Sequence, residues 1–316
     1  MRLVSISTTD LNATRFVEQD VYLAACGYES RAVHVSKTFM IPAKRKVALA
    51  FDLQQELNYT ANLNWFKVHE FEIEERPDSN VQEWIHEIVG GLARGTRCPN
   101  VTIDISCLNR LRLAHIINGI RSLDVDRATF NFVYNIAEYD APSKPVAPTS
   151  IAEPVTPEFA GWSTAPERPP AAILGLGYEQ SRAIGIIDHL EINNASWAFV
   201  PVSPITEYFS SVEGANKSLL DTIYAQGRAI RYDVLDPASL FRELNTLVVA
   251  LREIYNPILI PLGPKVFALC ALLAATIHQD VGVWRVSSGV LDTPVDRRPS
   301  SHTTAVRTVF QRHNSS

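Results

Sequence analysis

The chain of 316 residues contains two copies of one pattern, and this repeat limits the possible fold more strongly than local residue preferences do. Residues 21–35 read VYLAACGYESRAVHV, and residues 171–186 read AAILGLGYEQSRAIGI. Each copy has an apolar run typical of a buried strand, then Gly-Tyr-Glu, then Ser-Arg-Ala at the start of a helical pattern. The copies differ in length by one residue, Gln180.

The similarity continues downstream of the two Gly-Tyr-Glu turns. Four further pairs of segments correspond: 47–51 and 197–202, 68–92 and 229–251, 100–120 and 256–276, and 130–134 and 281–286. In each half, apolar runs suited to strands alternate with helical patterns, which is typical of a parallel sheet covered by helices. The sequence therefore predicts an α/β protein of two tandem Rossmann-like units, each with a mainly parallel sheet of about five strands and helices on both faces.

Proline content marks a boundary between the halves. Residues 140–170 hold eight of the 19 prolines. Because proline fixes φ and removes a backbone donor, this segment is predicted to be an extended linker. The remaining residues divide into a first unit at 1–139 and a second unit at 171–293. Residues 294–316 are polar with little periodicity, so we expect a polar tail there.

The charge and apolar patterns exclude several classes of protein. The formal net charge is −5, with acidic and basic residues interleaved, so a nucleic-acid partner is not expected. No stretch approaches the roughly 18 unbroken apolar residues of a membrane span, and the first residues lack a signal-peptide core. We therefore expect a cytoplasmic protein without a membrane partner.

The cysteines and histidines do not form a metal or redox motif. The four cysteines lie far apart without CxxC spacing, which favours reduced, structural thiols: Cys26, Cys98, Cys107 and Cys270. The histidines of the predicted helices have no HxxxH or HxH spacing, and residues 175–181 lack the third glycine of the dinucleotide fingerprint. The sequence therefore predicts neither a cofactor nor a metal.

Candidate ligand-binding residues follow the first and fourth predicted strands of each half. In an open parallel sheet, ligands bind at the carboxyl ends of the strands, where helix N-termini present unpaired N–H groups. After the first strand lie Gly27, Tyr28, Glu29 and Arg31 in the first half, and Gly177, Tyr178, Glu179 and Arg182 in the second. After the fourth strand lie Asp104, Ser106 and Arg110 in the first half, and Gly263 and Lys265 in the second. The first and fourth strands are neighbours in the usual doubly wound order, so these turns are expected to meet in a crevice.

The residue types at these turns predict an anionic ligand. Arginine and lysine bind phosphate or carboxylate, and tyrosine offers a stacking face, so a phosphorylated, nucleotide-like small molecule fits the pattern. In a structural interpretation that stays open, each tyrosine packs beneath its own turn and the glutamates form ion pairs, Glu29 with Arg110 and Glu179 with Lys265. Asp52, at the end of the second strand, is a candidate for binding a ribose hydroxyl or for capping the next turn.

Two other functions are compatible with the same residues, so the sequence leaves open whether the chain is an enzyme. In a nucleotide hydrolase or transferase, Glu29 or Asp104 would act as general base beside an arginine that stabilises developing negative charge. The active site would lie in the first half, because Ile260 or Pro261 takes the place of Asp104 in the second. Alternatively, the turns serve the fold alone, and the chain is a structural subunit of a multiprotein complex.

The fourth-strand segments carry a family resemblance. Residues 257–275 read PILIPLGPKVFALCALLAA, and this strand, basic turn and small-residue helix resemble the CRISPR-associated Rossmann fold domains, which sense cyclic oligonucleotides. Lys265 takes the basic position, and residues 102–120 resemble the same pattern with Ser106 and Arg110. The resemblance implies a nucleotide sensor or accessory subunit in prokaryotic defence, with the ligand between matching turns and the output supplied by a protein partner.

Overall fold

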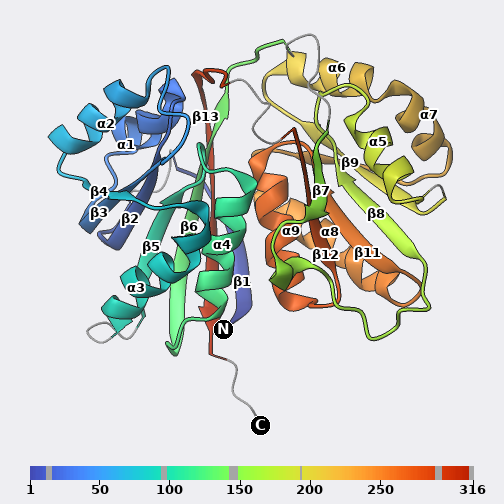
Figure 1. Cartoon of the computed structure of the whole chain (residues 1–316), viewed down its shortest axis with the longest axis horizontal. Helices are drawn as coiled ribbons and strands as arrows, with labels where there is room; N and C mark the ends of the chain where they lie inside the picture. Colours follow the sequence, from blue (N-terminus) through green and yellow to red (C-terminus); the bar gives the residue numbers. More distant parts are fainter. Residues whose placement is uncertain (12–15, 94–97, 142–148, 193, 289–293, 313–316) are drawn as a thin grey trace. The chain divides into compact units, whose positions relative to one another are not determined.

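The chain forms two compact units in the computed structural model, which describes all residues except 12–15, 94–97, 142–148, 193, 289–293 and 313–316 (Figure 1). The first unit comprises Met1–Glu138 together with Pro294–Ser316, and the second comprises Tyr139–Thr293. Each unit contains one mainly parallel sheet flanked by helices. The α/β class and the arrangement in two sheets, both predicted from the sequence, are therefore confirmed.

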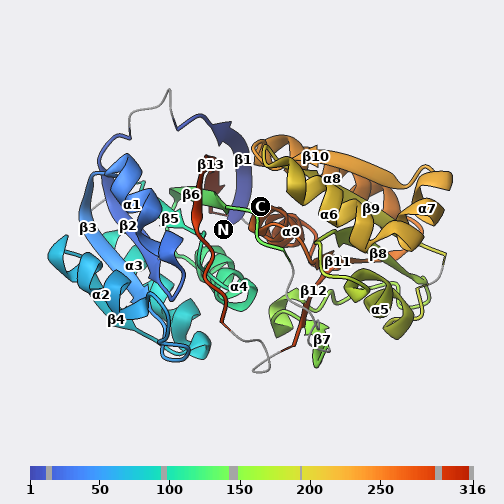
Figure 2. The same cartoon turned by 90° about the horizontal axis from the view of Figure 1, so that it is seen from above.

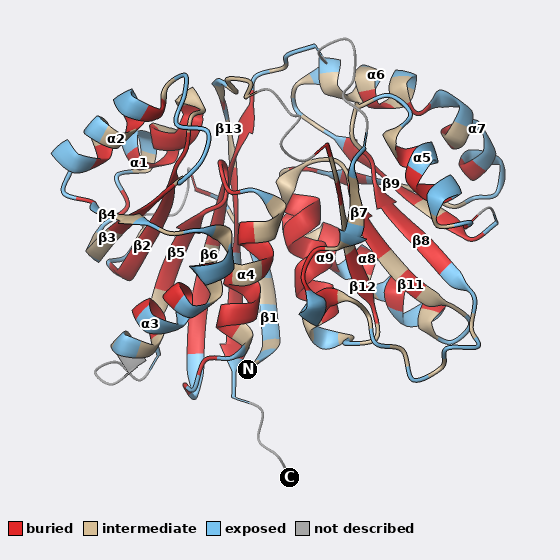
Figure 3. Ribbon diagram, viewed as in Figure 1, coloured by how far each residue is buried: buried red, intermediate tan, exposed pale blue. Residues whose placement is uncertain are grey.

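The sheet of the first unit has seven strands in the order β1-β13-β6-β5-β2-β3-β4. Their bounds are β1 (Arg2–Thr9), β2 (Gln19–Cys26), β3 (Ala43–Ala50), β4 (Glu72–Glu75), β5 (Asn100–Asp104), β6 (Arg127–Ala137) and β13 (Pro299–Gln311). Strands β2 to β6 are parallel, and β13 lies antiparallel between β6 and β1. The whole of β2 is buried (Figure 3), as expected for a parallel strand that is covered on both faces.

The helices of the first unit form two groups. They are α1 (His34–Phe39), α2 (Tyr59–Val68), α3 (Val81–Ala93) and α4 (Arg110–Arg121). Helices α1 and α2 share a core with Tyr22, Ala24 and Cys26, which alternate along β2 and so point to one face of the sheet. Helices α3 and α4 pack on each other.

The sheet of the second unit has six strands in the order β10-β9-β8-β11-β12-β7 (Figure 2). The strands are β7 (Ile151–Pro154), β8 (Pro170–Gly175), β9 (Ser196–Val202), β10 (Ala229–Asp233), β11 (Asn256–Pro261) and β12 (Gly282–Ser287). The helices are α5 (Arg182–His189), α6 (Thr206–Ala215), α7 (Lys217–Ala225), α8 (Pro237–Arg252) and α9 (Lys265–Ile277). Leu174 and Val200 of the sheet share a core with Ile186, Val212 and Leu220 of α5, α6 and α7.

The five parallel strands of each unit have the same spatial order, which is third, second, first, fourth and fifth along the sequence. The first strand therefore pairs with the fourth in both units, β2 with β5 and β8 with β11. The turns that follow these strands consequently lie side by side within each unit, as the sequence predicted.

Both sheets are larger than the predicted five strands. In the first unit, β13 forms from part of the predicted polar tail, 294–316, of which 313–316 lie outside the described residues. Three of its polar residues, Ser300, Thr304 and Thr308, are buried, although polar residues without periodicity predict an exposed tail. Thr308 is 0% exposed, and its hydroxyl donates to the carbonyl oxygen of Phe130 at 3.0 Å.

The predicted linker also contains sheet structure. Within 140–170, β7 pairs antiparallel with β12, so the described part of this segment belongs to the second unit. Pro154 ends this strand, and β7 is the edge strand of its sheet, where a proline does not interrupt a hydrogen-bonded ladder on both sides. Residues 142–148 of the predicted linker lie outside the described residues.

The apolar helices of the chain are short. Within the described residues, no helix combines the length and the apolar character needed to cross a membrane.

Candidate functional site

The Gly-Tyr-Glu turns lie at the carboxyl ends of β2 and β8, where the chain packs too closely to admit a side chain at the glycine. A Cβ at Gly27 would lie 2.7 Å from the ring of Phe51, and one at Gly177 would lie 2.6 Å from the carbonyl oxygen of Leu262. The turn after β11 makes the reciprocal contact, because a Cβ at Gly263 would lie 2.0 Å from a carbonyl oxygen of the β8 turn. These close contacts explain why glycine occupies the three positions, which the sequence predicted as ligand-binding.

In both units, the glutamate of the turn forms an ion pair with the arginine of the same motif. Glu29 Oε2 lies 2.5 Å from Arg31 Nε, and Glu179 Oε2 lies 2.6 Å from Arg182 Nη1. The two arginines are 6% and 11% exposed, but the Glu29 side chain is 13% exposed and that of Glu179 is 43% exposed. Burial lowers the pKa of Arg31, but Glu29, Cys107 and Tyr134 together raise it above the usual value, so the guanidinium stays charged.

The same arginines connect the first turn of each unit to the end of its fifth strand. Arg31 Nη1 donates to the carbonyl oxygen of Asn135 in β6 at 3.0 Å, and Arg182 Nη2 donates to the hydroxyl of Ser288, just after β12, at 3.0 Å. Both guanidinium groups are therefore used within their own units. Arg31, at 5% exposure, does not present its charge to a ligand.

Two asparagines hold the Gly-Tyr-Glu turns and were not selected from the sequence. Asn62 Nδ2 donates to the carbonyl oxygens of Gly27 and Glu29 at 2.9 and 2.8 Å. Asn216 Nδ2 donates to the carbonyl oxygen of Gly177 at 2.8 Å. Each asparagine follows an alanine downstream of the second parallel strand, and aligning this Ala-Asn pair between the halves would have identified both residues.

The turn after β5 buries two of the predicted site residues. Asp104 is 2% exposed and its Oδ1 accepts from the backbone N–H of Ser106 at 2.9 Å. The Ser106 hydroxyl, also buried, accepts from the backbone N–H of Asn135 at 2.9 Å. Arg110 and Lys265 are half-buried and occupy the first positions of α4 and α9. The turn residues Asp104 and Ser106 therefore serve the local hydrogen bonding.

A different arginine of α4 forms the ion pairs at this edge of the first unit. Arg112, two positions after Arg110, is 3% exposed and its Nη2 lies 3.2 Å from Asp52 Oδ1. Its Nε pairs with Asp78, and the guanidinium lies 4.3 Å from the ring centroid of Phe51. Asp52 thus forms an ion pair with an arginine, whereas the sequence predicted ribose binding or turn capping for it.

Each tyrosine of the repeated turns packs on aromatic neighbours of its own unit. The ring of Tyr28 lies edge-on to Phe51, with centroids 6.4 Å apart. Tyr178 lies 6.3 Å from Tyr139 and 5.6 Å from Tyr208, as part of a half-buried tyrosine cluster. These contacts agree with the structural interpretation of the tyrosines.

The buried cysteines have environments that suit structural thiols. Burial raises the pKa of Cys26 to about 12 and also raises that of Cys270. The Cys107 thiol, 7% exposed, donates to Glu29 Oε2 at 3.6 Å. None of these cysteines is in a disulfide, and Cys98 is exposed.

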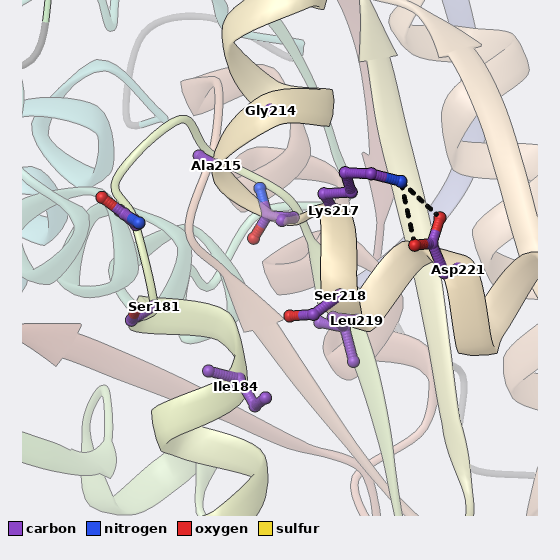
Figure 4. A pocket seen from close by; sticks show the side chains of 10 residues that line it. Ser181, Ile184, Gly214, Ala215, Lys217, Ser218, Leu219 and Asp221 are labelled. Atoms are coloured by element: carbon purple, nitrogen blue, oxygen red, sulfur yellow. Dashed lines mark hydrogen bonds and ion pairs between the residues drawn. The ribbon is translucent and has the colours of Figure 1, made fainter.

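A pocket of about 390 Å³ opens beside the Gly-Tyr-Glu turn of the second unit (Figure 4). Its walls come from the start of α5, the end of α6 and the start of α7: Gln180, Ser181, Ile184, Gly214, Ala215, Asn216, Lys217, Ser218, Leu219 and Asp221. The volume falls in the range of small-molecule sites, about 300–1,000 Å³. Figure 4 shows Ser181 and Ile184 on one side of the pocket and Ser218 and Leu219 on the other.

Two helix N-termini border this pocket, and neither is capped by a side chain. The N-cap residue of α5 is Ser181, whose hydroxyl does not bind the helix. The N-cap residue of α7 is Asn216, whose amide donates to carbonyl groups instead of accepting from the first turn. The first-turn N–H groups and the helix dipoles give this side of the pocket a positive potential, which favours an anion.

The charged pair at the pocket rim is exposed. Lys217 Nζ lies 3.0 Å from Asp221 Oδ2, and Figure 4 shows the lysine side chain directed toward this carboxylate. Both side chains are largely exposed, and such pairs contribute only about 0–1 kcal/mol. The ammonium group can therefore exchange its partner for a bound anion at small cost.

None of the predicted ligand-binding residues is among the residues that line the pocket. Gln180 and Ser181, which do line it, lie between Glu179 and Arg182 in the sequence. The one-residue insertion at Gln180 distinguishes this copy of the motif from the first, and it is the sequence feature that could have indicated the pocket.

No metal centre accompanies these features in the described part of the chain, where no group of three or more His, Cys, Asp or Glu side chains is placed to hold an ion. Comparison with protein-family models and with curated proteins finds no match to this chain.

Proposed function

We propose that the second unit binds a phosphorylated, nucleotide-like small molecule in the pocket between α5, α6 and α7. The observation that carries this proposal is the convergence of two uncapped helix N-termini on a pocket of ligand size. Phosphate oxygens accept hydrogen bonds from such N–H groups and are stabilised by the helix dipole. Ile184 and Leu219 supply an apolar wall for the remainder of the ligand.

We further propose that the two units are copies of one Rossmann-like unit. The support is the common order of the parallel strands together with three shared contacts: the Glu–Arg pair in each turn, the arginine bond to the fifth strand and the asparagine bond to the turn glycine. Backbone order and side-chain contacts thus repeat together.

The biological setting that we propose is a nucleotide-signal sensor or accessory subunit in prokaryotic defence or signalling. Its support is the resemblance of residues 257–275 and 102–120 to the CRISPR-associated Rossmann fold domains. A protein partner would then carry the output. The alternative of a nucleotide hydrolase has less support, because Asp104 is buried in its own turn and Glu29 is paired with Arg31.

Calorimetric titration with adenosine 5′-monophosphate and with adenosine tests the proposed ligand class. We expect the phosphorylated compound to bind at least about tenfold more tightly, which corresponds to about 1.4 kcal/mol. Inorganic phosphate should compete with it. Absence of binding by adenosine 5′-monophosphate, cyclic oligoadenylate and inorganic phosphate would contradict the proposal.

Two glycine variants locate the site. Gly214 lines the pocket and Gly185 does not, yet both are helical and a Cβ at either position meets nothing within 4 Å. Gly214→Leu should fill the pocket and lower the affinity for adenosine 5′-monophosphate at least about tenfold. Gly185→Leu is the matched control and should leave it unchanged. Equal affinities in the two variants would place the ligand elsewhere.

A further inference from the structure

We propose that occupation of the pocket is transmitted to the carboxyl end of β12 through Asn216, the Gly-Tyr-Glu turn and Arg182. The inference rests on the proposed function, because it assigns a regulated output to the same pocket. It is carried by a series of two hydrogen bonds and one ion pair, joined by the backbone of residues 177–179, that begins at a pocket wall and ends at a buried serine.

The first step is the side chain of Asn216. This residue lines the pocket at the start of α7, and it is only 5% exposed. Its Nδ2 donates to the carbonyl oxygen of Gly177 and to that of Val212, both at 2.8 Å. One amide group therefore holds the last turn of α6, the start of α7 and the Gly-Tyr-Glu turn together. A ligand bound to the first turn of α7 acts directly on this group.

The second step is the turn between β8 and α5. Ser181 lines the pocket and adopts a left-handed backbone conformation, with φ of 62°, which is unfavourable for a residue other than glycine. The surrounding contacts hold it there, and the Glu179–Arg182 pair spans it at 2.6 Å. A ligand that shifts Ser181 changes the position of both charged partners. Release of this strained conformation is the change that we propose the ligand brings about.

The third step leads to the fifth strand. Arg182 Nη2 donates to the hydroxyl of Ser288 at 3.0 Å, and Ser288 is 0% exposed. This serine follows β12 directly, and in the sequence it precedes the point at which the chain returns to the first unit at Pro294. The end of β12 is thus the place in the second unit that a change in the pocket reaches.

The first unit contains the corresponding contacts with a less exposed glutamate. There Asn62 binds Gly27, Glu29 pairs with Arg31, and Arg31 binds Asn135. The Glu29 side chain is 13% exposed, against 43% for Glu179. Because the more exposed glutamate is less strongly held by its arginine, the second unit is the one suited to respond to a ligand.

Hydrogen exchange at β12, followed by mass spectrometry, tests the transmission. We expect saturation with adenosine 5′-monophosphate to change amide exchange at the carboxyl end of Gly282–Ser287 at least twofold in the wild-type protein. Ser288→Ala removes the acceptor of Arg182. This variant should bind adenosine 5′-monophosphate with an affinity within about threefold of wild type. Its amide exchange at β12 should no longer change when the ligand binds. Ser288→Cys, which is closer in volume and a weak acceptor, carries the same expectation if the alanine variant fails to fold.

Two further variants distinguish loss of the Ser288 hydroxyl from the general effect of changing a buried serine in this sheet. Ser288→Thr retains the hydroxyl and should retain the response. Ser196→Ala is the matched control, because Ser196 is a buried serine of the same sheet that donates to the carbonyl oxygen of Ile192 at 3.2 Å and takes no part in the series. It should respond as wild type does.

The possible failures are distinguishable. If wild type binds adenosine 5′-monophosphate in the Gly214-dependent pocket but exchange at β12 does not change, the transmission is wrong and the proposed function stands. The same conclusion holds if Ser288→Ala and Ser288→Cys respond like wild type. If no phosphorylated compound binds, the proposed function fails and the transmission fails with it.

Discussion

Removing the carboxylate from the Glu29–Arg31 pair tests how strongly burial determines what each Glu–Arg pair contributes to the stability of its unit. Glu29→Gln leaves the guanidinium of Arg31, which is 5% exposed, without its charged partner. Breaking a buried pair from one side costs about 3–5 kcal/mol. Glutamine still offers an oxygen that accepts from Arg31, so we expect the lower end, about 3 kcal/mol.

The second unit provides the matched comparison for this substitution. Glu179→Gln makes the same chemical change at the same position of the repeat, but the Glu179 side chain is 43% exposed. Water solvates the Glu179 carboxylate better there, although Arg182 is only 11% exposed, and the expected loss is below about 1 kcal/mol. The two variants thus differ mainly in burial.

The assay is urea unfolding with hydrogen exchange measured separately on peptides of each unit, because the two units need not unfold together. For a denaturant slope of about 3 kcal/mol/M, Glu29→Gln should lower the midpoint of the first unit by about 1 M. The midpoint of the second unit should move by less than about 0.3 M in Glu179→Gln. Equal losses in the two units would refute the argument from burial. Partial recovery in Glu29→Gln combined with Arg31→Met, which removes both charges, would support it.

Three further predictions concern packing, pH and chain topology. Gly263→Ala should destabilise the second unit by about 2–3 kcal/mol in thermal unfolding, because the new Cβ meets the Leu176 carbonyl oxygen. Gly185→Ala is the control: it lies at an open helical position and should stabilise the unit by up to about 1 kcal/mol. Burial, and then a neighbouring arginine, lower the pKa of His278 below its usual value, so the unfolded state takes up a proton at higher pH than the folded state does. The stability of the second unit should therefore be complete above pH of about 6.5 and fall as the pH is lowered below it, and His278→Asn should flatten this dependence in urea midpoints measured from pH 7 to 5. A chain truncated after Arg298 lacks β13 and should fail to fold its first unit by circular dichroism and hydrogen exchange, whereas loss of a polar tail would have no effect.

The parallel strands were predictable because burial on both faces makes them continuous apolar runs. Residues 21–26 and 171–174 have this character, and they are β2 and β8 in the structure. The antiparallel strands lack it. In β13, Arg307 is exposed while its neighbours Val306 and Thr308 are buried, so a polar segment became the strand between β6 and β1.

The candidate site was predictable in position but not in detail. The sequence placed the Gly-Tyr-Glu turns at the carboxyl edge beside the fourth-strand turns, and the strand pairing confirms this. It did not show that Arg31 binds Asn135 or that Asn62 holds the turn, because these partners are 104 and 35 positions apart. Contacts at such separations follow from the strand order and not from local spacing.

By itself, the sequence determined where the apolar strands lie, that the motif recurs, and that its charged residues follow the strands, since all three depend on local pattern. Only the tertiary structure decided which charges neutralise one another, which residues enclose a pocket, and which polar segment completes the first sheet. The physical reason is that burial and hydrogen-bond partners are properties of neighbours in space. The glutamate of the same Gly-Tyr-Glu sequence is therefore 13% exposed in one unit and 43% exposed in the other.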